Sequence, residues 1–383
     1  MIVVLSSGTI ALVVAVCEAW QRGWRLADDS GIAAKPLRRF DIRHATIRFL
    51  GFGMTVAAAA FIYWLLPEYH GSFYDPFWHL LRLLVPVALP VAALNFFWSD
   101  SRLSTPDDAY WELGRIALRR GDRPIAWQSL KHHGLSWMVK VFFLPLMVVY
   151  AAGQISDLGP AFSTLVTKGA LHGAYGLIFR LCYTIDLLFC VAGYILTIRV
   201  LDTHIRSTDG TVFGWLVALI CYQPFYSVIG SYYLRYDDNR PWTDYFAGHP
   251  LLSQIWGAGI IVLVAAYALT TVSFGLRFSN LTNRGIITSG PYRFFKHPAY
   301  LSKNLSWWMS SVPFLSSSGW TIALRHCLLL LMLNAVYWLR ARTEERHLSA
   351  DPTYAAYAAW IAEHGLTAKL VSGTRRLAKR WCE

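Results

Sequence analysis

Charged residues are scarce in this chain of 383 residues. They make up 15% of the sequence, whereas soluble domains carry roughly 25%. Hydrophobic residues make up 55%, and apolar runs recur that are long enough to cross the ~30 Å hydrocarbon core of a bilayer. This composition excludes an ordinary soluble protein and predicts an integral membrane protein in contact with the lipid bilayer.

A single basic face is also lacking, although the net charge is +12. The lysines and arginines cluster between the apolar runs, which is the pattern that the positive-inside bias produces. No basic patch is interleaved with aromatic residues in the manner of a nucleic-acid interface. We therefore assign no nucleic-acid partner.

Paired cysteines are missing as well. Five of the six cysteines lie in apolar runs, and no two form a C-x-x-C pair. This spacing supports neither a disulfide framework nor a zinc site, so no metal is expected. The six positions are Cys17, Cys182, Cys190, Cys221, Cys327 and Cys382.

What the chain has instead is about nine apolar segments that could each cross a membrane as a helix. The predicted fold class is therefore all-α, a polytopic helical membrane protein. No A-x-A-like cleavage site follows the first segment, so we interpret it as a retained helix rather than a signal peptide. The segments lie near 2–20, 46–67, 77–99, 136–157, 176–200, 211–234, 252–276, 298–316 and 319–339.

Every second loop between these segments is basic. Arginines and lysines gather in the first loop and in the loop 100–135, whereas the loops 68–76 and 235–250 are mainly acidic. Since basic loops stay in the cytoplasm, we expect the N-terminus outside and the C-terminus in the cytoplasm of a bacterial inner membrane or an equivalent membrane. The loop 100–135 is either a short amphipathic surface helix or a plain connector.

A few residues inside the apolar segments need separate interpretation. A charged residue within a membrane segment usually suggests a functional site. Arg180 and Asp186, however, are six residues apart and do not share a helix face. Whether they line a polar cavity stays open. His326 is expected to form a hydrogen bond between helices. Gly51 and Gly53 indicate close helix packing.

The stretch 284–308 carries the first chemical signal. A Gly290-Pro291 turn leads to His297-Pro298, and proline is favoured at the first position of a helix. The unpaired N–H groups and positive dipole end of such a helix can receive an anion such as a carboxylate.

The same helix would present a polar face that becomes aromatic with depth. Tyr300 and Asn304 follow His297 by three and seven residues, and Trp307 and Trp308 lie one turn further. Residues at this spacing share a helix face. The alternative is an interfacial cap with an aromatic belt, which many membrane helices have.

The second signal is the stretch 340–357, just after the ninth apolar segment. Arg340 and Glu344 are four residues apart, and Glu345 follows at once. Two neighbouring acidic residues are unusual here, because the other loops on the expected cytoplasmic side are basic. The alternative is a solvated helix end with a weak surface ion pair.

Together these stretches resemble the isoprenylcysteine carboxyl methyltransferase and phospholipid methyltransferase superfamily, over roughly residues 250–365. Its signature is G-x-Y-x-x-x-R/K-H-P-x-Y at the mouth of a helix hairpin, followed by R-x-x-x-E and a tyrosine pair. The matching residues are Gly290, Tyr292, Lys296, His297, Pro298, Tyr300, Arg340, Glu344, Glu345, Tyr354 and Tyr357.

The resemblance implies S-adenosyl-L-methionine as cofactor. The residues that it assigns to the cofactor are Arg284, Gly285, Ile286, Ile287, Tyr292, His297, Pro298, Ala299, Tyr300, Glu344 and Glu345. It places Arg340 on the substrate side, where we also expect Asn304 and Trp308, and makes Arg340 and Glu344 the catalytic candidates. The charges of these residues agree with that assignment. Glu344 suits the ammonium group of the cofactor, and the faces of tyrosine rings attract its sulfonium group.

Two departures from the family pattern are evident. The chain has Asp351-Pro352-Thr353 before Tyr354, where the family has a glycine before the tyrosine pair, which puts the positions of Tyr354 and Tyr357 in doubt. An additional N-terminal transmembrane block of about four helices, residues 1–175, resembles no known family. We therefore divide the chain into this block and a methyltransferase-like core with a cytoplasmic tail, residues 176–383.

The predicted function is methyl transfer to a lipid-like or isoprenoid-bearing acceptor at the cytoplasmic membrane face. The nucleophile could be a carboxylate, phosphate, amine or thiol, and the oligomeric state stays open. No G-x-G-x-x-G follows a predicted strand, so a soluble Rossmann-type methyltransferase domain is not encoded. The alternatives are an NADPH-dependent reductase of the sterol type and a non-catalytic lipid-binding protein with the same core.

Overall fold

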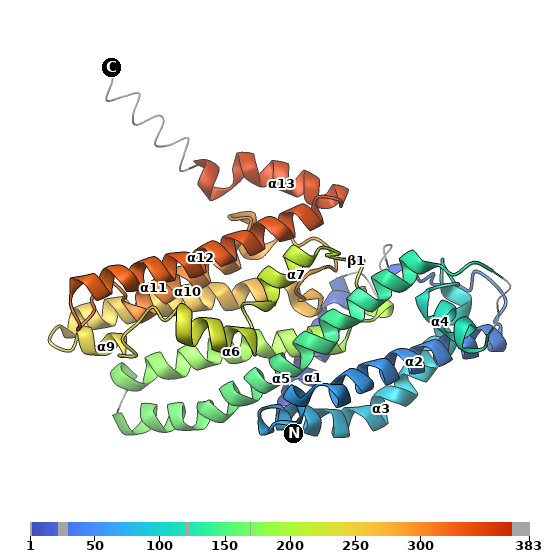
Figure 1. The fold of residues 1–383 in the computed structure, drawn as a ribbon, viewed down its shortest axis with the longest axis horizontal. Helices are drawn as coiled ribbons and strands as arrows, with labels where there is room; N and C mark the ends of the chain where they lie inside the picture. The colour runs from blue at the N-terminus through green and yellow to red at the C-terminus, as the bar shows by residue number, and fades with distance from the viewer. Residues whose placement is uncertain (1, 22–29, 120–122, 169, 370–383) are drawn as a thin grey trace, which may run out of the picture. The chain divides into compact units, whose positions relative to one another are not determined.

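The computed structural model describes residues 2–21, 30–119, 123–168 and 170–369 (Figure 1). These residues form two compact units, each built from separate parts of the chain. Unit 1 takes its residues from 1–153, 187–210 and 275–285, and unit 2 from 154–186, 211–274 and 286–383. The predicted boundary near residue 175 stays a prediction.

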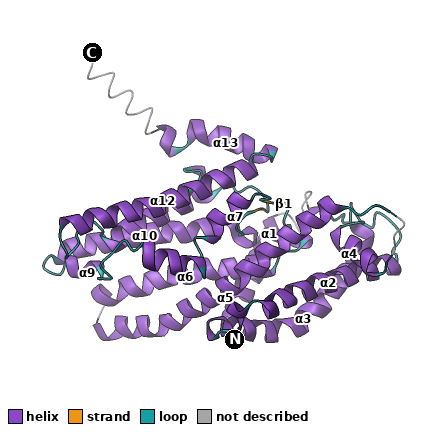
Figure 2. Ribbon diagram, viewed as in Figure 1, coloured by secondary structure: helices purple, strands orange, loops and turns teal. Residues whose placement is uncertain are grey.

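The described chain is almost entirely helical, with one short antiparallel strand pair (Figure 2). The longer helices are α1 (Ile2–Gln21), α2 (Ile42–Leu65), α3 (Asp75–Ser99), α4 (Ala109–Ala117), α5 (Trp127–Lys168), α6 (Ala170–Ile195), α7 (Val212–Leu219), α10 (Pro250–Phe274), α11 (Pro298–Ser311), α12 (Trp320–Leu348) and α13 (Pro352–His364). The short elements are η2 (Pro67–His70), η3 (Ser72–Tyr74), η4 (Asp100–Arg102), η5 (Arg199–Leu201), α8 (Phe225–Val228), η6 (Ile229–Tyr233), α9 (Trp242–Tyr245), η7 (Gly275–Arg277), η8 (Gly290–Arg293), β1 (Ser207–Thr208) and β2 (Thr282–Asn283).

Six helices among the described residues are long and apolar enough to cross a membrane. They confirm an all-α polytopic membrane protein, but the predicted count of nine is not confirmed. The candidate spans are Ile42–Leu65, Ser72–Arg102, Trp127–Thr167, Gly173–Ile195, Pro250–Arg277 and Trp320–Leu348.

The three remaining predicted segments are shorter or broken. The apolar part of α1 is Leu5–Cys17, and α11 has only 14 residues. The segment 211–234 is not one helix but the three pieces α7, α8 and η6. Pro224 lies between the first two pieces, and a proline inside a helix removes a backbone donor and clashes with the preceding turn. Hydropathy does not detect such a break.

In unit 1, α4 packs closely against α2. A Cβ atom on Gly51 would lie 1.8 Å from the carbonyl oxygen of Tyr110, and one on Gly114 would lie 1.9 Å from that of Ile47. Only glycine allows two backbones to approach so closely. The interpretation as a packing residue is confirmed for Gly51 but not for Gly53, because no described atom lies within 4 Å of a Cβ placed there. The loop 100–135 contains a helix, α4.

Unit 1 also contains the strand pair. Ser207 pairs with Asn283 and Thr208 with Thr282, which joins the segment after α6 to the segment after α10. Arg284 follows directly, so its position is fixed by this ribbon.

In unit 2, α11 lies alongside α10, and α12 returns beside them (Figure 1). The indole of Trp256 donates to the carbonyl oxygen of Met309 at 2.8 Å, and that of Trp308 donates to Asn334 Oδ1 at 2.7 Å. These two hydrogen bonds connect α10 to α11 and α11 to α12.

The intramembrane charges have partners within unit 2. Asp186 on α6 is buried and accepts hydrogen bonds from Tyr267 and Thr271 of α10. Arg180 pairs with Asp157 on α5. The hydrogen bond expected between His326 and another helix is not found among the described residues; His326 lies 3.8 Å from a carboxylate oxygen of Asp238, which is in a loop.

Candidate active site

The helix α11 begins at Pro298, as the sequence predicts, with His297 at its N-cap position. The His297 side chain makes no hydrogen bond to the first turn of the helix. Its Nε2 atom instead lies 2.9 Å from Glu345 Oε1 near the end of α12. The two stretches that the sequence singles out are therefore joined in space.

Glu345 is held by three basic side chains. Besides His297, Lys296 Nζ lies 3.4 Å from one carboxylate oxygen and Arg342 Nη1 lies 3.3 Å from the other. A carboxylate with this many partners holds the ends of the two helices together. The contacts give Glu345 a structural part in addition to its predicted cofactor part, which stays a prediction.

Glu344 has a different environment. The hydroxyl of Tyr300 donates to its Oε1 atom, and His297 Nδ1 lies 3.9 Å from its Oε2 atom, beyond hydrogen-bond distance. The side chain remains 31% exposed, compared with 21% for Glu345. Of the two neighbouring carboxylates, Glu344 is the one with capacity for a cationic ligand.

The guanidinium group of Arg340 lies within a tyrosine cluster formed by Tyr222, Tyr300 and Tyr337. Its central carbon is 5.6, 5.3 and 5.3 Å from the three ring centroids, in that order. The side chain is only 4% exposed. Aromatic faces attract a cation, so the cluster fixes the charge of Arg340 one helical turn before Glu344.

Tyr292 forms a small buried core with the final helix. Tyr354, Tyr357 and Ile361 of α13 pack with it, and Ile286 is partly buried against them. Ile287 belongs to the same contact group. Burial raises the pKa of the Tyr292 phenol, and the charge of nearby Glu344 raises it further.

After the departure at residues 351–354, both tyrosines of the pair are buried against Tyr292. Asp351 caps α13 by accepting a hydrogen bond from the backbone N–H of Thr353 at 2.8 Å. Tyr357 donates to the carbonyl oxygen of Tyr292 at 2.8 Å. Burial, and then the charges of Glu345 and Glu344, raise the pKa of Tyr354, so this phenol lies within the field of both carboxylates.

Asn304 and Trp308 lie on the part of α11 that faces the bundle. Trp308 is engaged with Asn334, as described above. Asn304 is half-buried, and its side-chain oxygen has no hydrogen-bond partner among the described residues. Pro298 is buried and Ala299 half-buried at the start of the helix. Their predicted ligand roles stay predictions.

Arg284 and Gly285 belong to unit 1, whereas the other predicted site residues belong to unit 2. Arg284 is 2% exposed and donates to three carbonyl oxygens: Thr203 at 2.6 Å, Phe278 at 2.7 Å and Gly193 at 3.0 Å. Gly285 has a φ of +111°, in the region that favours glycine. The contacts give Arg284 a structural part, and its predicted cofactor role is untested.

Sequence reasoning missed three residues beside Arg340. Tyr337 precedes it by one helical turn, and Lys303 follows Tyr300 by one turn, so helical spacing could have indicated both. The ammonium of Lys303 lies 5.5 Å from the Tyr337 ring centroid. Tyr222 comes from the broken segment 211–234, and no local signal relates it to Arg340.

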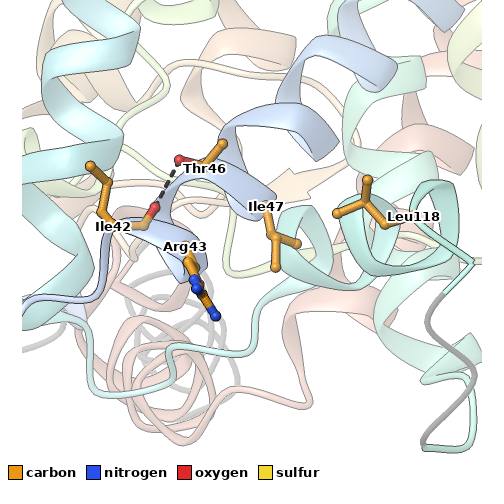
Figure 3. Close-up of a pocket in the computed structure, with 5 residues that line it drawn as sticks. All are labelled: Ile42, Arg43, Thr46, Ile47 and Leu118. Atoms are coloured by element: carbon orange, nitrogen blue, oxygen red, sulfur yellow. Dashed lines mark hydrogen bonds between the residues drawn. The ribbon is translucent and has the colours of Figure 1, made fainter.

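One pocket of about 300 Å³ lies elsewhere, in unit 1. Its lining comes from the start of α2 and from Leu118, just after α4 (Figure 3). Thr46 donates to the carbonyl oxygen of Ile42 at 2.7 Å at its edge. It contains none of the predicted site residues. The lining residues are Ile42, Arg43, Thr46, Ile47 and Leu118.

The start of α11 and the end of α12 thus bring together His297, Tyr300, Arg340 and the two glutamates. Residues 253–350 match the model of the isoprenylcysteine carboxyl methyltransferase (ICMT) family. The ICMT match covers about a quarter of the chain and supports a membrane methyltransferase. It confirms the resemblance stated above and ends before the segment Asp351–Tyr357. No curated protein and no solved structure matches the chain.

The residues present fit the cofactor that this family generally uses, S-adenosylmethionine. Glu344 has the charge that an ammonium group requires, and the first turn of α11 has backbone N–H groups of the kind that suit a carboxylate. Two buried acceptors or donors of unit 2, Asn304 Oδ1 and the Tyr354 hydroxyl, have no partner among the described residues. Since buried polar groups are normally hydrogen-bonded, these atoms are suited to a polar ligand.

Proposed function

We propose that this chain transfers a methyl group from S-adenosylmethionine to an amphiphilic, lipid-like acceptor at the cytoplasmic face of the membrane. The observation that carries the proposal is the junction between α11 and α12. There, the hydroxyl of Tyr300 donates to Glu344, and the ring of Tyr300 lies 5.3 Å from the guanidinium carbon of Arg340. One tyrosine thus contacts both a carboxylate and a cation, at the end of a membrane hairpin.

Glu344, Tyr300 and the first turn of α11 would hold the cofactor. The carboxylate of Glu344 would meet an ammonium, and the free backbone N–H groups after Pro298 would meet a carboxylate. The Tyr300 ring would face a sulfonium. When bound, S-adenosylmethionine supplies a methyl group that is already activated by its positive sulfur, so positioning could supply much of the rate.

Arg340 would orient the acceptor. The tyrosine cluster holds its guanidinium in one place, and a planar guanidinium suits an anionic oxygen group such as a carboxylate or a phosphate. The burial of Arg340 keeps water away from that contact and strengthens it. Asn304 and Trp308 would extend the acceptor side toward the membrane interior.

The proposed site lies on the basic side of the membrane, which is expected to be the cytoplasm, where the cofactor is made available. Cys382, in the C-terminal tail outside the described residues, offers a direct test. Labelling of intact cells with an impermeant thiol reagent should leave Cys382 unmodified, and labelling of opened cells should modify it. Labelling of Cys382 in intact cells would overturn this orientation.

Two measurements test the function itself. Calorimetry on the purified chain should show binding of S-adenosylmethionine and not of NADPH, which separates a methyltransferase from a sterol-type reductase. Lipid extracts of cells with and without the gene should then differ by a species heavier by one methylene unit. Binding of NADPH alone would overturn the proposal, and binding of neither would favour a non-catalytic lipid-binding protein.

A further inference from the structure

Lys303 of α11 is a charged residue in unit 2 that the proposed function does not use. It follows Tyr300 by three residues, so the two lie near the same face of the helix. Its side chain is half-buried, and it forms no hydrogen bond or ion pair with the described residues. An ammonium group has three donors and no acceptor. The capacity of Lys303 to donate is therefore unused within the described part of the chain.

Three aromatic rings, which we call the Lys303 cage, surround the ammonium group. Its Nζ atom lies 5.4 Å from the ring centroid of Tyr267 on α10, 5.3 Å from that of Trp307 on α11 and 5.5 Å from that of Tyr337 on α12. The faces of such rings attract a cation, but they provide no oxygen acceptor for its N–H groups. The cage thus fixes the position of a cation whose donors can bind a ligand.

The acid next to the cage is engaged by other groups. Asp186 on α6 accepts hydrogen bonds from the hydroxyls of Tyr267 and Thr271. Tyr267 therefore contacts Lys303 through its ring and Asp186 through its hydroxyl. Asp186 and Lys303 attract each other electrostatically, but they form no ion pair. The carboxylate of Asp186 leaves the donors of Lys303 unoccupied.

Lys303 and Arg340 contact the same ring. The guanidinium carbon of Arg340 lies 5.3 Å from the ring centroid of Tyr337, and Lys303 Nζ lies 5.5 Å from it. Arg340 is the residue to which the proposed function assigns the acceptor. Because both cations lie next to one phenol ring, Lys303 is placed to reach the head group that Arg340 orients.

A third donor lies between the same two helices. Asn334 of α12 precedes Tyr337 by three residues, and its Oδ1 atom accepts a hydrogen bond from the indole of Trp308 on α11 at 2.7 Å. Its Nδ2 atom is buried and has no hydrogen-bond partner among the described residues. Since buried donors are normally paired, this amide suits an oxygen atom of a ligand.

Two cations and an amide donor suit a head group that carries two negative charges on several oxygen atoms. We propose that Lys303 and Arg340 together bind the acceptor through a phosphate monoester rather than through a carboxylate. A phosphate monoester carries nearly two negative charges at neutral pH, and both cations form charge-assisted hydrogen bonds to phosphate. The inference rests on the proposed function, which assigns the acceptor to Arg340.

The charges of the reaction balance for such an acceptor. One phosphate oxygen would form a bond to the methyl carbon of S-adenosylmethionine, while the bond from that carbon to the sulfur breaks and leaves its electron pair on the sulfur. The sulfonium becomes a neutral sulfide, the dianion becomes a monoanionic methyl ester, and no proton has to be removed. The product has one negative charge less than the acceptor, so the two cations hold it less tightly.

Ligands that differ by one charge test the assignment. Purified full-length protein in a neutral detergent is titrated at about pH 8, where a phosphate monoester is fully a dianion. The probes are octyl phosphate, methyl octyl phosphate, octanoate and inorganic phosphate. Octyl phosphate should bind about ten-fold more tightly than methyl octyl phosphate or octanoate, the difference expected for one charged hydrogen bond.

Two results with wild-type protein would overturn the proposal. Equal affinity for octyl phosphate and its methyl ester would show that the second charge is not recognised. Equal affinity for octyl phosphate and inorganic phosphate would show that the ligand is a free anion and not a lipid-like acceptor.

Variants assign the preference to Lys303. Lys303→Met keeps an apolar side chain within the cage but removes the ammonium group, and should lower the affinity for octyl phosphate about ten-fold. Lys303→Arg restores a cation and should keep the preference for the dianion. Lys303→Gln replaces Lys303→Met if the latter does not fold. Lys131→Met, at an exposed lysine of unit 1, is the matched control and should bind like wild type.

A purely structural Lys303 would give a different result. Lys303→Met would then lower the melting temperature and leave the preference for octyl phosphate unchanged, which would overturn the assigned role. The affinity for S-adenosylmethionine is measured on the same samples. If the cofactor binds but octyl phosphate is not preferred, the phosphate assignment fails and the proposed methyl transfer stands. If octyl phosphate is preferred but the cofactor does not bind, the phosphate site is confirmed and the proposed function fails.

Discussion

Arg284 in unit 1 and Arg340 in unit 2 are both almost fully buried, but different groups surround them. Arg284 donates to three backbone carbonyl oxygens of the segments around it. Arg340 lies among three tyrosine rings at the junction of α11 and α12. Carbonyl oxygens accept hydrogen bonds from a guanidinium, and rings attract its charge through their faces. The comparison teaches that burial alone does not tell which part a buried arginine has in the molecule.

The largest effect that would test this comparison is expected from Arg284→Met. The substitution removes the three hydrogen bonds from the Arg284 guanidinium to the carbonyl oxygens of Thr203, Gly193 and Phe278, and a hydrogen bond to a charged group contributes about 1.5–3 kcal/mol. We expect the free energy of unfolding to fall by at least about 3 kcal/mol, measured by thermal unfolding in detergent. Arg123→Met, at an exposed ion pair, is the matched control. Equal melting temperatures for the two variants would show that the three hydrogen bonds do not stabilise the fold.

A smaller but specific effect is expected from Glu344→Gln. Loss of one charged partner in a partly buried hydrogen bond costs about 1.5–3 kcal/mol, or roughly ten- to a hundred-fold in affinity for S-adenosylmethionine. Calorimetry on a folded variant measures it. The matched control is Glu363→Gln, an exposed glutamate of α13 outside the proposed site. The role of Glu344 is excluded if its variant keeps wild-type affinity.

Arg340→Lys tests the other side of the junction. It keeps the charge within the tyrosine cluster but removes the planar fork that grips a carboxylate or phosphate. Turnover should fall about ten-fold, the loss expected for one charged hydrogen bond, while the affinity for S-adenosylmethionine stays near that of wild type. Equal losses of cofactor affinity in Arg340→Lys and Glu344→Gln would mean that Arg340 serves Glu344 and not the acceptor.

The smallest expected effect concerns the two tyrosines of α13. Tyr357→Phe removes the hydrogen bond to the carbonyl oxygen of Tyr292 and should lower the free energy of unfolding by about 1 kcal/mol. Tyr354→Phe should leave stability nearly unchanged, because the Tyr354 hydroxyl has no partner among the described residues. If this hydroxyl meets the cofactor, Tyr354→Phe weakens cofactor binding instead. Equal destabilisation by both substitutions would contradict this division.

Local signals account for what could be predicted of the site. The start of α11 at Pro298 follows from the missing N–H of proline, a property of one residue. The spacing of Arg340 and Glu344 on α12 follows from helical periodicity. The partners of Arg340 could not be predicted in full, because Tyr222 is more than a hundred residues away along the chain and lies between two short helices of the segment 211–234.

The membrane segments show the same limit. Hydropathy identifies six long apolar helices correctly, because the requirement to cover the bilayer acts on each segment by itself. It also counts 211–234 as one of three further spans, although Pro224 lies between the short pieces into which that segment is divided. Asp186 is a further case. The sequence shows an acidic residue in an apolar run, but it does not show that the hydroxyl groups of Tyr267 and Thr271 donate hydrogen bonds to it.

The sequence by itself determined the membrane class, the helical fold and the two motifs of the proposed active site, because these depend on composition and on short-range spacing. Only the tertiary structure decided that His297 reaches Glu345, that Tyr300 joins Glu344, and that three tyrosines enclose Arg340. It alone also decided that Arg284 is occupied by backbone carbonyl oxygens. Which partner a side chain receives depends on residues that are distant in the chain and become neighbours only when the helices pack.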